Sequence, residues 1–192
     1  IKPLQHQEAL LPKIPKYRKL DTGMSFGNLN GPHVVLFTGC VMDIFYNPVH
    51  WDTIEALSSN GYYITTPKQT CCGALAHHAS EDDITVQLAK ENVQQLLKAN
   101  PDYIVVNSAG CGSTLKDYAD LLKGDPILSR HATEFSKKVV DVMELLDKKP
   151  LKPIRKPLNE TVTYHAACHL HHAQKIQTAP EKILSQIPGL TL

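Results

Sequence analysis

Short apolar runs rich in β-branched residues alternate along this chain with longer segments of helical pattern. HVVLFTG (33–39) precedes a helical segment over 47–61, and two further runs, YYITTP (62–67) and DYIVVN (102–107), are each followed by another. Strands that alternate with helices form parallel sheets, because each helix carries the chain back over the sheet in a right-handed crossover. We therefore predict an α/β fold with a mainly parallel sheet, helices on both faces, and Rossmann-like βα units.

Caps and stops mark the expected helices. Asn47 is the expected N-cap of the first helix, with Pro48 at its first helical position. Ser80 is the expected cap of the second helix, which Asn100 and Pro101 end. The remaining expected elements are helices over 112–124 and near 131–147, and a fourth strand, TVTYH, over 161–165.

Length and charge limit the class of protein. The chain has 192 residues, of which 42% are hydrophobic, and this suffices for one well-buried core. A formal net charge of +1 gives no overall attraction to nucleic acid or to an anionic membrane. No apolar run approaches the ~20 residues of a membrane span, and the start lacks the basic-then-apolar pattern of a signal peptide. We expect a cytoplasmic chain with no transmembrane segment and no nucleic-acid partner.

Two stretches rich in proline and lysine stand outside the alternation. The opening residues have no sustained period, which indicates a connector over 1–30. KKPLKPIRKP (148–157) indicates a solvated linker over 148–160, because its prolines hold it extended, and a binding patch is the less favoured alternative. These stretches flank a first cysteine-rich domain over 31–147 and leave a final segment, 161–192.

Five cysteines follow the expected strands. Cys40 comes after the first, the adjacent Cys71 and Cys72 after the second, Cys111 after the third and Cys168 after the fourth. Since the carboxyl ends of parallel strands meet at one edge of a sheet, we expect all five thiols at this edge, where open α/β sheets bind ligands. Packing alone would instead place cysteines inside strands or on helix stripes. An odd number of cysteines without an export signal favours metal binding or thiol chemistry over a disulfide scaffold.

The neighbours of these thiols distinguish between metals. Thiolates select zinc, copper(I) or iron–sulfur clusters. Zinc sites usually take ligands in C-x2-C pairs, which this chain lacks, so zinc is less favoured. An iron–sulfur cluster accepts ligands from several loops and has backbone close to its sulfides. Glycines that permit such an approach, although each is also an ordinary turn residue, are Gly39, Gly73, Gly110 and Gly112.

A single cysteine, then the sequence Cys-Cys-Gly at 71–73, then a further cysteine at 111 is an order that resembles the cysteine-rich CCG domain. This domain is shared by a heterodisulfide reductase component, lactate-utilisation proteins and the iron–sulfur subunit of glycolate oxidase. The resemblance extends from about Gly31 to the end of the chain. VNSAGCGSTLKDYADLL (106–122) and YHAACHLHHAQKI (164–176) are most similar to the glycolate oxidase iron–sulfur subunit. The resemblance implies an iron–sulfur cluster held by cysteines in an electron-transfer complex.

One position departs from the family pattern. Where the fuller motif has C-x-x-C, this chain has Ser108 three residues before Cys111. The complete motif can hold a noncubane cluster pair on five cysteines and perform disulfide chemistry, whereas four thiols remain here: Cys40, Cys71, Cys72 and Cys111. Four thiolates suit a 4Fe–4S cluster, which we expect to be lost in air. Ser108 either ligates through oxygen or hydrogen-bonds a sulfide, and the second role is favoured.

A second copy of the motif is indicated near the end of the chain. VVLFTGC (34–40) and VTYHAAC (162–168) each place a cysteine six residues after a valine. We interpret 161–192 as the start of a second, truncated CCG motif, in which Cys168 binds no cluster because its partner thiols would follow Leu192. The histidines of CHLHH indicate a polar helix start more than they indicate ligands.

Two classes of function remain. In the first, the chain is part of the iron–sulfur electron-transfer subunit of a glycolate or other 2-hydroxy acid oxidase, and does no catalysis itself. Flavoprotein subunits would oxidise the substrate, the cluster would pass electrons toward the membrane quinone pool, and the complex would hold the chain at the inner face of the cytoplasmic membrane. In the second, it is a thiol–disulfide enzyme of the heterodisulfide reductase kind, a lactate-utilisation subunit, or a zinc-stabilised protein-binding module.

Overall fold

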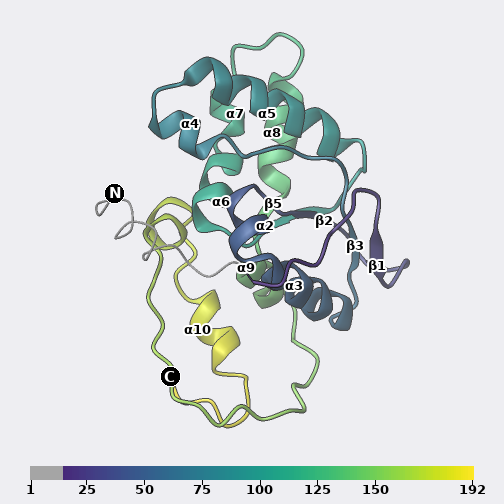
Figure 1. Cartoon of the computed structure of the whole chain (residues 1–192), viewed down its shortest axis with the longest axis vertical. Coiled ribbons are helices and arrows are strands. Elements are labelled where there is room, and N and C mark those ends of the chain that lie inside the picture. Colours follow the sequence, from purple (N-terminus) through teal and green to yellow (C-terminus); the bar gives the residue numbers. More distant parts are fainter. Residues whose placement is uncertain (1–14) are drawn as a thin grey trace, which may run out of the picture.

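The computed structural model describes residues 15–192, so residues 1–14 of the expected connector lie outside the described residues. The described residues form a five-stranded sheet in the order β1-β3-β2-β4-β5 (Figure 1). The strands are β1 (Ser25–Gly27), β2 (His33–Phe37), β3 (Tyr63–Thr65), β4 (Tyr103–Val106) and β5 (Val139–Asp141). β2 to β5 are parallel to their neighbours, and β1 is antiparallel to β3. The expected α/β fold with a mainly parallel sheet is confirmed.

Helices follow each parallel strand along the chain, as the alternation predicts. They are α2 (Val41–Phe45), α3 (Asn47–Ser59), α4 (Ala74–His78), α5 (Asp82–Leu97), α6 (Ala109–Lys116), α7 (Tyr118–Leu121), α8 (Ser129–Lys138) and α9 (Val142–Asp147). A π-helix, η1 (His169–Ala173), and α10 (Ala179–Leu184) complete the described elements.

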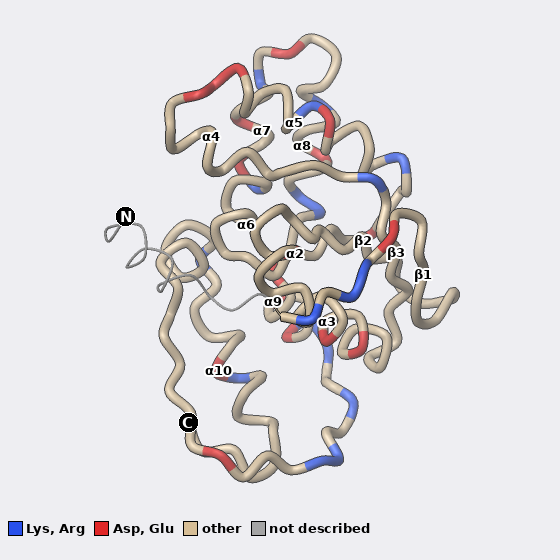
Figure 2. The backbone as a smooth tube through the Cα atoms, in the orientation of Figure 1, with Lys and Arg blue, Asp and Glu red and all other residues tan. Residues whose placement is uncertain are grey.

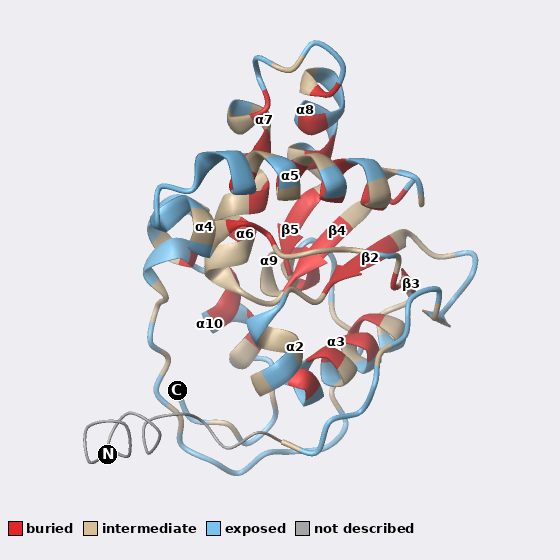
Figure 3. Cartoon of the chain, turned by 45° about the horizontal axis from the view of Figure 1, so that its top comes forward, coloured by how far each residue is buried: buried red, intermediate tan, exposed pale blue. Residues whose placement is uncertain are grey.

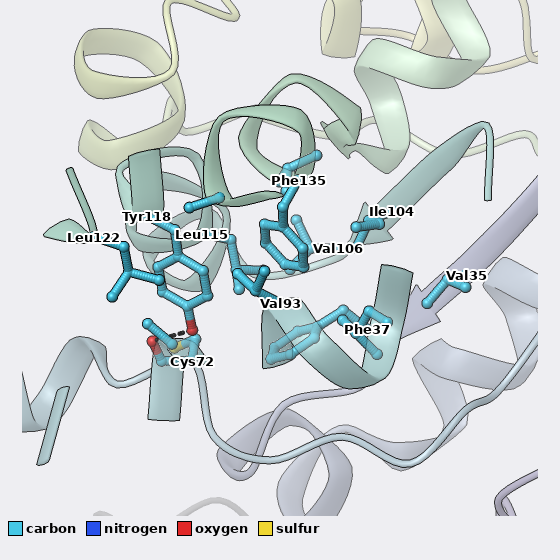
Figure 4. Packing of buried hydrophobic residues seen from close by; sticks show 14 residues of the cluster. Val35, Phe37, Cys72, Val93, Ile104, Val106, Leu115, Tyr118, Leu122 and Phe135 are labelled. Atoms are coloured by element: carbon cyan, nitrogen blue, oxygen red, sulfur yellow. Dashed lines mark hydrogen bonds between the residues drawn. The ribbon is translucent and has the colours of Figure 1, made fainter. Parts of the chain in front are cut away.

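The central strand β2 buries its residues alternately on the two faces of the sheet, because successive side chains of a strand point in opposite directions. Val34 and Leu36 pack in a core with α3 and α9. Val35 and Phe37 pack in a second core with α5, α6, α7 and α8 (Figure 4). Figure 3 shows β2, β4 and β5 as a buried layer between these helices. Both faces are therefore covered, as expected.

Two expected elements near the C-terminal side are wrong. The helix near 131–147 is interrupted, because Val139 and Val140, each 2% exposed, form β5 beside β4. β-branched side chains suit this buried edge strand better than a helix interior. The strand expected over 161–165 does not form, and Thr161 makes only an isolated bridge to Thr191. The position beside β4 where such a strand would pair is occupied by β5.

Two expected caps are also wrong. The N-cap of α3 is Tyr46, and Asn47 lies within the helix, fully buried. The N-cap of α5 is Glu81, and no side chain caps this helix. Ser80 adopts φ +62°, in the left-handed region, and so belongs to the turn before the helix.

The segments outside the alternation have different structures. Within the expected connector 1–30, Ser25–Gly27 adds an edge strand to the sheet, where a Cβ on Gly27 would overlap the Tyr62 carbonyl oxygen. Residues 148–160 form neither helix nor strand and are mostly exposed, and Figure 2 shows Lys and Arg spaced along this loop. None of the helices within residues 15–192 combines the length and the apolarity needed to cross a bilayer.

Candidate thiol site at the carboxyl edge of the sheet

Four of the five cysteines lie where three parallel strands end. Cys40 follows β2 as the N-cap of α2, Cys71 and Cys72 follow β3, and Cys111 lies in the first turn of α6 after β4. In the sheet, β2 and β4 are neighbours, with β3 beyond one and β5 beyond the other. Connections from these two central strands therefore leave in opposite directions, and open α/β sheets bind ligands at such a switch point.

The four sulfur atoms form two close pairs. Cys40 Sγ lies 3.4 Å from Cys71 Sγ, and Cys72 Sγ lies 3.1 Å from Cys111 Sγ. The loop of the first pair passes beside the second, since a Cβ on Gly39, whose φ is +68°, would lie 3.7 Å from Cys111 Sγ. Within residues 15–192, no three His, Cys, Asp or Glu side chains are grouped as they are around a single metal ion. The arrangement is thus a set of two thiol pairs at one edge.

Gln69 joins the two loops that carry the first pair. Its Oε1 accepts the backbone N–H of Thr38 at 2.8 Å, and its Nε2 donates to the carbonyl of Leu36 at 3.1 Å. Thr38 is two residues before Cys40, and Gln69 is two residues before Cys71. One amide therefore fixes the spacing of both loops.

Asn92 and Tyr118 hold the adjacent cysteines from inside the fold. Asn92 Nδ2 donates to the carbonyl of Cys71 at 2.9 Å. The Tyr118 hydroxyl donates to the carbonyl of Cys72 at 2.8 Å (Figure 4). Asn92 Nδ2 also donates to the Tyr118 hydroxyl, and both side chains are fully buried. Leaving a buried polar group unpaired costs about 1–3 kcal/mol, so these contacts fix the backbone that carries both thiols.

Sequence reasoning missed these three supporting residues. Gln69, Asn92 and Tyr118 belong to no motif, and their role depends on contacts between distant segments. The sequence carries a weak signal for Asn92 alone of the three. Asn92 lies beside Val93 on the buried side of its helix, and a buried polar side chain needs a hydrogen-bond partner.

The hydrogen bond between Cys72 and Cys111 polarises this pair. The Cys72 thiol donates, and this bond, followed by burial, raises the pKa of Cys72 strongly. The same bond, with one from the Ser108 hydroxyl, lowers the pKa of Cys111 to about 7 despite its burial. In the other pair, burial and then the hydrogen bond with Cys71 raise the pKa of Cys40. Cys111 is therefore more readily deprotonated than Cys40 or Cys72, and the thiolate is the form in which cysteine binds metal or attacks disulfides.

The glycines predicted to line the site differ in what requires them to lack a side chain. Gly73 adopts φ +84° at the start of α4, which disfavours any side chain there. A Cβ on Gly112 would lie 2.6 Å from Gln174 Nε2, whereas one on Gly110 would meet open space. Gln174 Nε2 donates to the carbonyl of Ala109 at 2.9 Å. Gly112 thus admits a contact between α6 and the C-terminal segment.

Cys168 is exposed, and among the described residues it makes no hydrogen bond with any of the four paired thiols. Cys168 is the N-cap of η1, and no strand lies between α9 and η1. This corrects the expectation that Cys168 directly follows a fourth strand of the sheet. Its neighbour His169 has its ring 6.1 Å from the ring of His78 in α4, so η1 lies beside the thiol-bearing edge.

Comparisons with known proteins agree with this geometry. The family model described as a cysteine-rich domain, CCG, matches residues 34–116, which contain all four paired thiols. A probable glycolate oxidase iron–sulfur subunit of Bacillus subtilis is 33% identical over 97% of this chain and 43% of its own length. An uncharacterized iron–sulfur protein of Methanococcus maripaludis is 39% identical over 82% of this chain and 29% of its own. Lactate utilization protein A of Shouchella clausii is 32% identical over 83% of this chain and 67% of its own length.

The chain spans less than half the length of the first two of these relatives and about two thirds of the third. No solved structure matches it significantly.

Proposed function

This chain belongs to the CCG cysteine-rich domain family, and we propose that it binds an iron–sulfur cluster through Cys40, Cys71, Cys72 and Cys111. The observation that carries the proposal is the meeting of two thiol pairs at the switch point of the sheet. Thiolates are the ligands such clusters require, and clusters accept them from several loops.

A 4Fe–4S cluster is the type we propose, because four cysteine thiolates complete its ligand set. Ser108 then acts beside the cluster and not on it, through the hydroxyl that helps to lower the pKa of Cys111. When bound, the cluster supplies one-electron transfer. The residues of this chain hold it in place, with Gln69, Asn92 and Tyr118 fixing the loops that carry its ligands.

The function we propose is electron transfer within a complex that oxidises glycolate or another 2-hydroxy acid. Flavoprotein subunits would oxidise the substrate, and electrons would pass through this chain toward the membrane quinone pool, with the complex peripheral to the inner face of the cytoplasmic membrane. The names of relatives, a glycolate oxidase subunit and lactate utilization protein A, support this class. So does the surface beside Cys40, where Val41, Ile44 and Leu75 are about half exposed or more, since apolar side chains around a redox site suit a partner protein.

Counting iron, sulfide and zinc on one anaerobically reconstituted sample tests the cluster. About four irons and four sulfides per chain are expected. Stoichiometric zinc without sulfide would instead support a zinc-stabilised binding module.

A second candidate is thiol–disulfide exchange, favoured by the 3.1 Å approach of Cys72 to Cys111 and by the lowered pKa of Cys111. It predicts that the chain without iron reduces a small disulfide stoichiometrically, with Cys72 and Cys111 recovered as one disulfide. Bound iron with no such reaction supports electron transfer alone.

A further inference from the structure

A pocket of about 500 Å³ lies at the same edge of the sheet but on its other face. The thiol pairs pack with the core of α5 to α8, whereas this pocket is formed by α3, the start of α9 and the C-terminal segment. Most of its wall is apolar, contributed by Val49, Ala56, Val142, Met143, Leu146 and Leu170. Its size is within the range of small-molecule sites, and its walls suit a hydrocarbon chain.

Asp141 supplies the charged group of this pocket. It is only 4% exposed, and its carboxylate accepts the backbone N–H of Met143 at 2.8 Å as the N-cap of α9. Burial nevertheless raises the pKa of Asp141 to about 6. The charge of Lys116 acts in the opposite direction, but Lys116 is itself paired with Glu144 at 2.9 Å. The capping box adds the backbone N–H of Glu144, so Asp141 is a nearly buried carboxylate held by two backbone N–H groups and without an ion pair within the described residues.

The other polar residues of the wall include further acceptors. Asn107 donates through Nδ2 to Thr53 Oγ1 at 2.9 Å, and its Oδ1 has no hydrogen-bond partner among the described residues. Asp52 adds a second carboxylate, and the wall also contains Thr53, Tyr164 and His165, whose side chains can donate as well as accept. No Lys or Arg is found among the described residues that line the pocket. A carboxylate ligand such as a 2-hydroxy acid would be repelled here, whereas a cationic donor would be attracted.

We propose that this pocket binds a primary alkylammonium group, with the alkyl chain against the apolar wall and the ammonium at Asp141. An ammonium carries three donors and no acceptor, which matches the carboxylates of Asp141 and Asp52 and the unpaired amide oxygen of Asn107. It would also supply the counter-charge that the Asp141 carboxylate lacks. Two sources share this chemistry, a free small amine and the lysine side chain of a protein, whose four-carbon stem ends in the same group.

Binding of butylammonium to the whole 192-residue chain tests the proposal. The probe is titrated at about pH 8, where an amine is protonated and Asp141 is ionised, while the backbone amides of Val142 and Met143 are followed by NMR. Butanol and butyrate serve as the uncharged and anionic matches of the same chain length. Butylammonium should bind at least about tenfold more tightly than either, since hydrogen bonds to charged groups contribute about 1.5–3 kcal/mol.

The variant Asp141→Asn should weaken butylammonium binding about tenfold or more without unfolding the chain, because asparagine is also a good N-cap. Glu91→Gln, which removes an exposed carboxylate on α5 outside the pocket, is the matched control and should bind as the parent does. Ala56→Leu should block the alkyl chain while leaving Asp141 in place.

A second probe, Nα-acetyl-lysine methylamide, separates the two sources of the ammonium group. If it binds more tightly than butylammonium, the ligand is a lysine side chain, and if it binds more weakly, the ligand is a free amine. Equal binding of butanol or butyrate, or no effect of Asp141→Asn, would overturn the proposal.

Discussion

The sulfur of Cys72 lies 3.1 Å from the sulfur of Cys111, although 39 positions of sequence separate the two residues. Cys72 is buried in the core with Tyr118, and Cys111 sits in the first turn of α6, so one thiol is anchored and the other approaches it from the switch point. A ligand held by this pair and by the Cys40–Cys71 pair would join three strand-end loops that are otherwise linked by side-chain hydrogen bonds.

Replacing any one of the four paired cysteines should remove most of the iron from a reconstituted sample. Serine at Cys40, Cys71, Cys72 or Cys111 should each leave well under about half of the parent's iron and sulfide, because each variant retains only three of four thiolates. Iron and sulfide are counted per folded chain, with circular dichroism as the measure of folding. Ser108→Ala is the control and should retain most of the iron. Full iron content in Cys72→Ser would contradict the ligand assignment.

Two glycines of α6 should respond differently to the same substitution. Gly112→Ala places a Cβ against Gln174 Nε2, so the amide must move and lose its bond to the Ala109 carbonyl. Gly110→Ala meets open space and should be at least as stable as the parent. We expect the free energy of unfolding of Gly112→Ala to be about 1 kcal/mol below that of Gly110→Ala. Hydrogen exchange in η1 should accelerate only in Gly112→Ala, and identical behaviour of the two variants would contradict the contact.

Much of this fold could be predicted from the sequence because its strands are continuous apolar runs. β2, β3 and β4 fall inside the expected segments, and the thiols follow from them, since the carboxyl ends of parallel strands share an edge. β5 was not predicted, because Val139–Asp141 is short and lies among apolar residues whose spacing also fits a helix. Only pairing with β4, a tertiary contact, decides between the two.

The candidate site could be predicted to the level of its thiols and no further. The cysteines have a motif, but the pairing of Cys40 with Cys71 depends on Gln69, which reaches across from one loop to another. The wrong cap at Ser80 has the same origin: the local pattern favoured a cap, and the turn leading into α5 placed this residue at positive φ instead.

Acidity should stabilise the chain through Asp141. Burial raises the pKa of Asp141 from 3.8 to about 6, so between these values the folded chain binds more protons than the unfolded chain. The contribution to the free energy of unfolding is complete below about pH 4 and is lost as the pH rises through about 6, by up to about 3 kcal/mol. Denaturant titrations across this range measure it. Asp141→Asn should remove this part of the pH dependence, and an unchanged profile in that variant would assign the effect to another group.

Cys168 should bind no iron in this chain, because it is exposed and belongs to neither thiol pair, and a single thiolate cannot hold a cluster that needs three or four. Cys168→Ser should therefore keep the parent's iron and sulfide. Since Cys168 is exposed and the other four thiols would be ligated, the loaded parent should also react with one equivalent of iodoacetamide per chain, and Cys168→Ser with none. The two measurements separate ligation from damage, because a variant that merely misfolds loses iron and exposes further thiols together. If iron falls in Cys168→Ser as far as in Cys111→Ser while the fold is retained, Cys168 is a ligand of the first site, and our interpretation of 161–192 as the start of a separate motif fails with it.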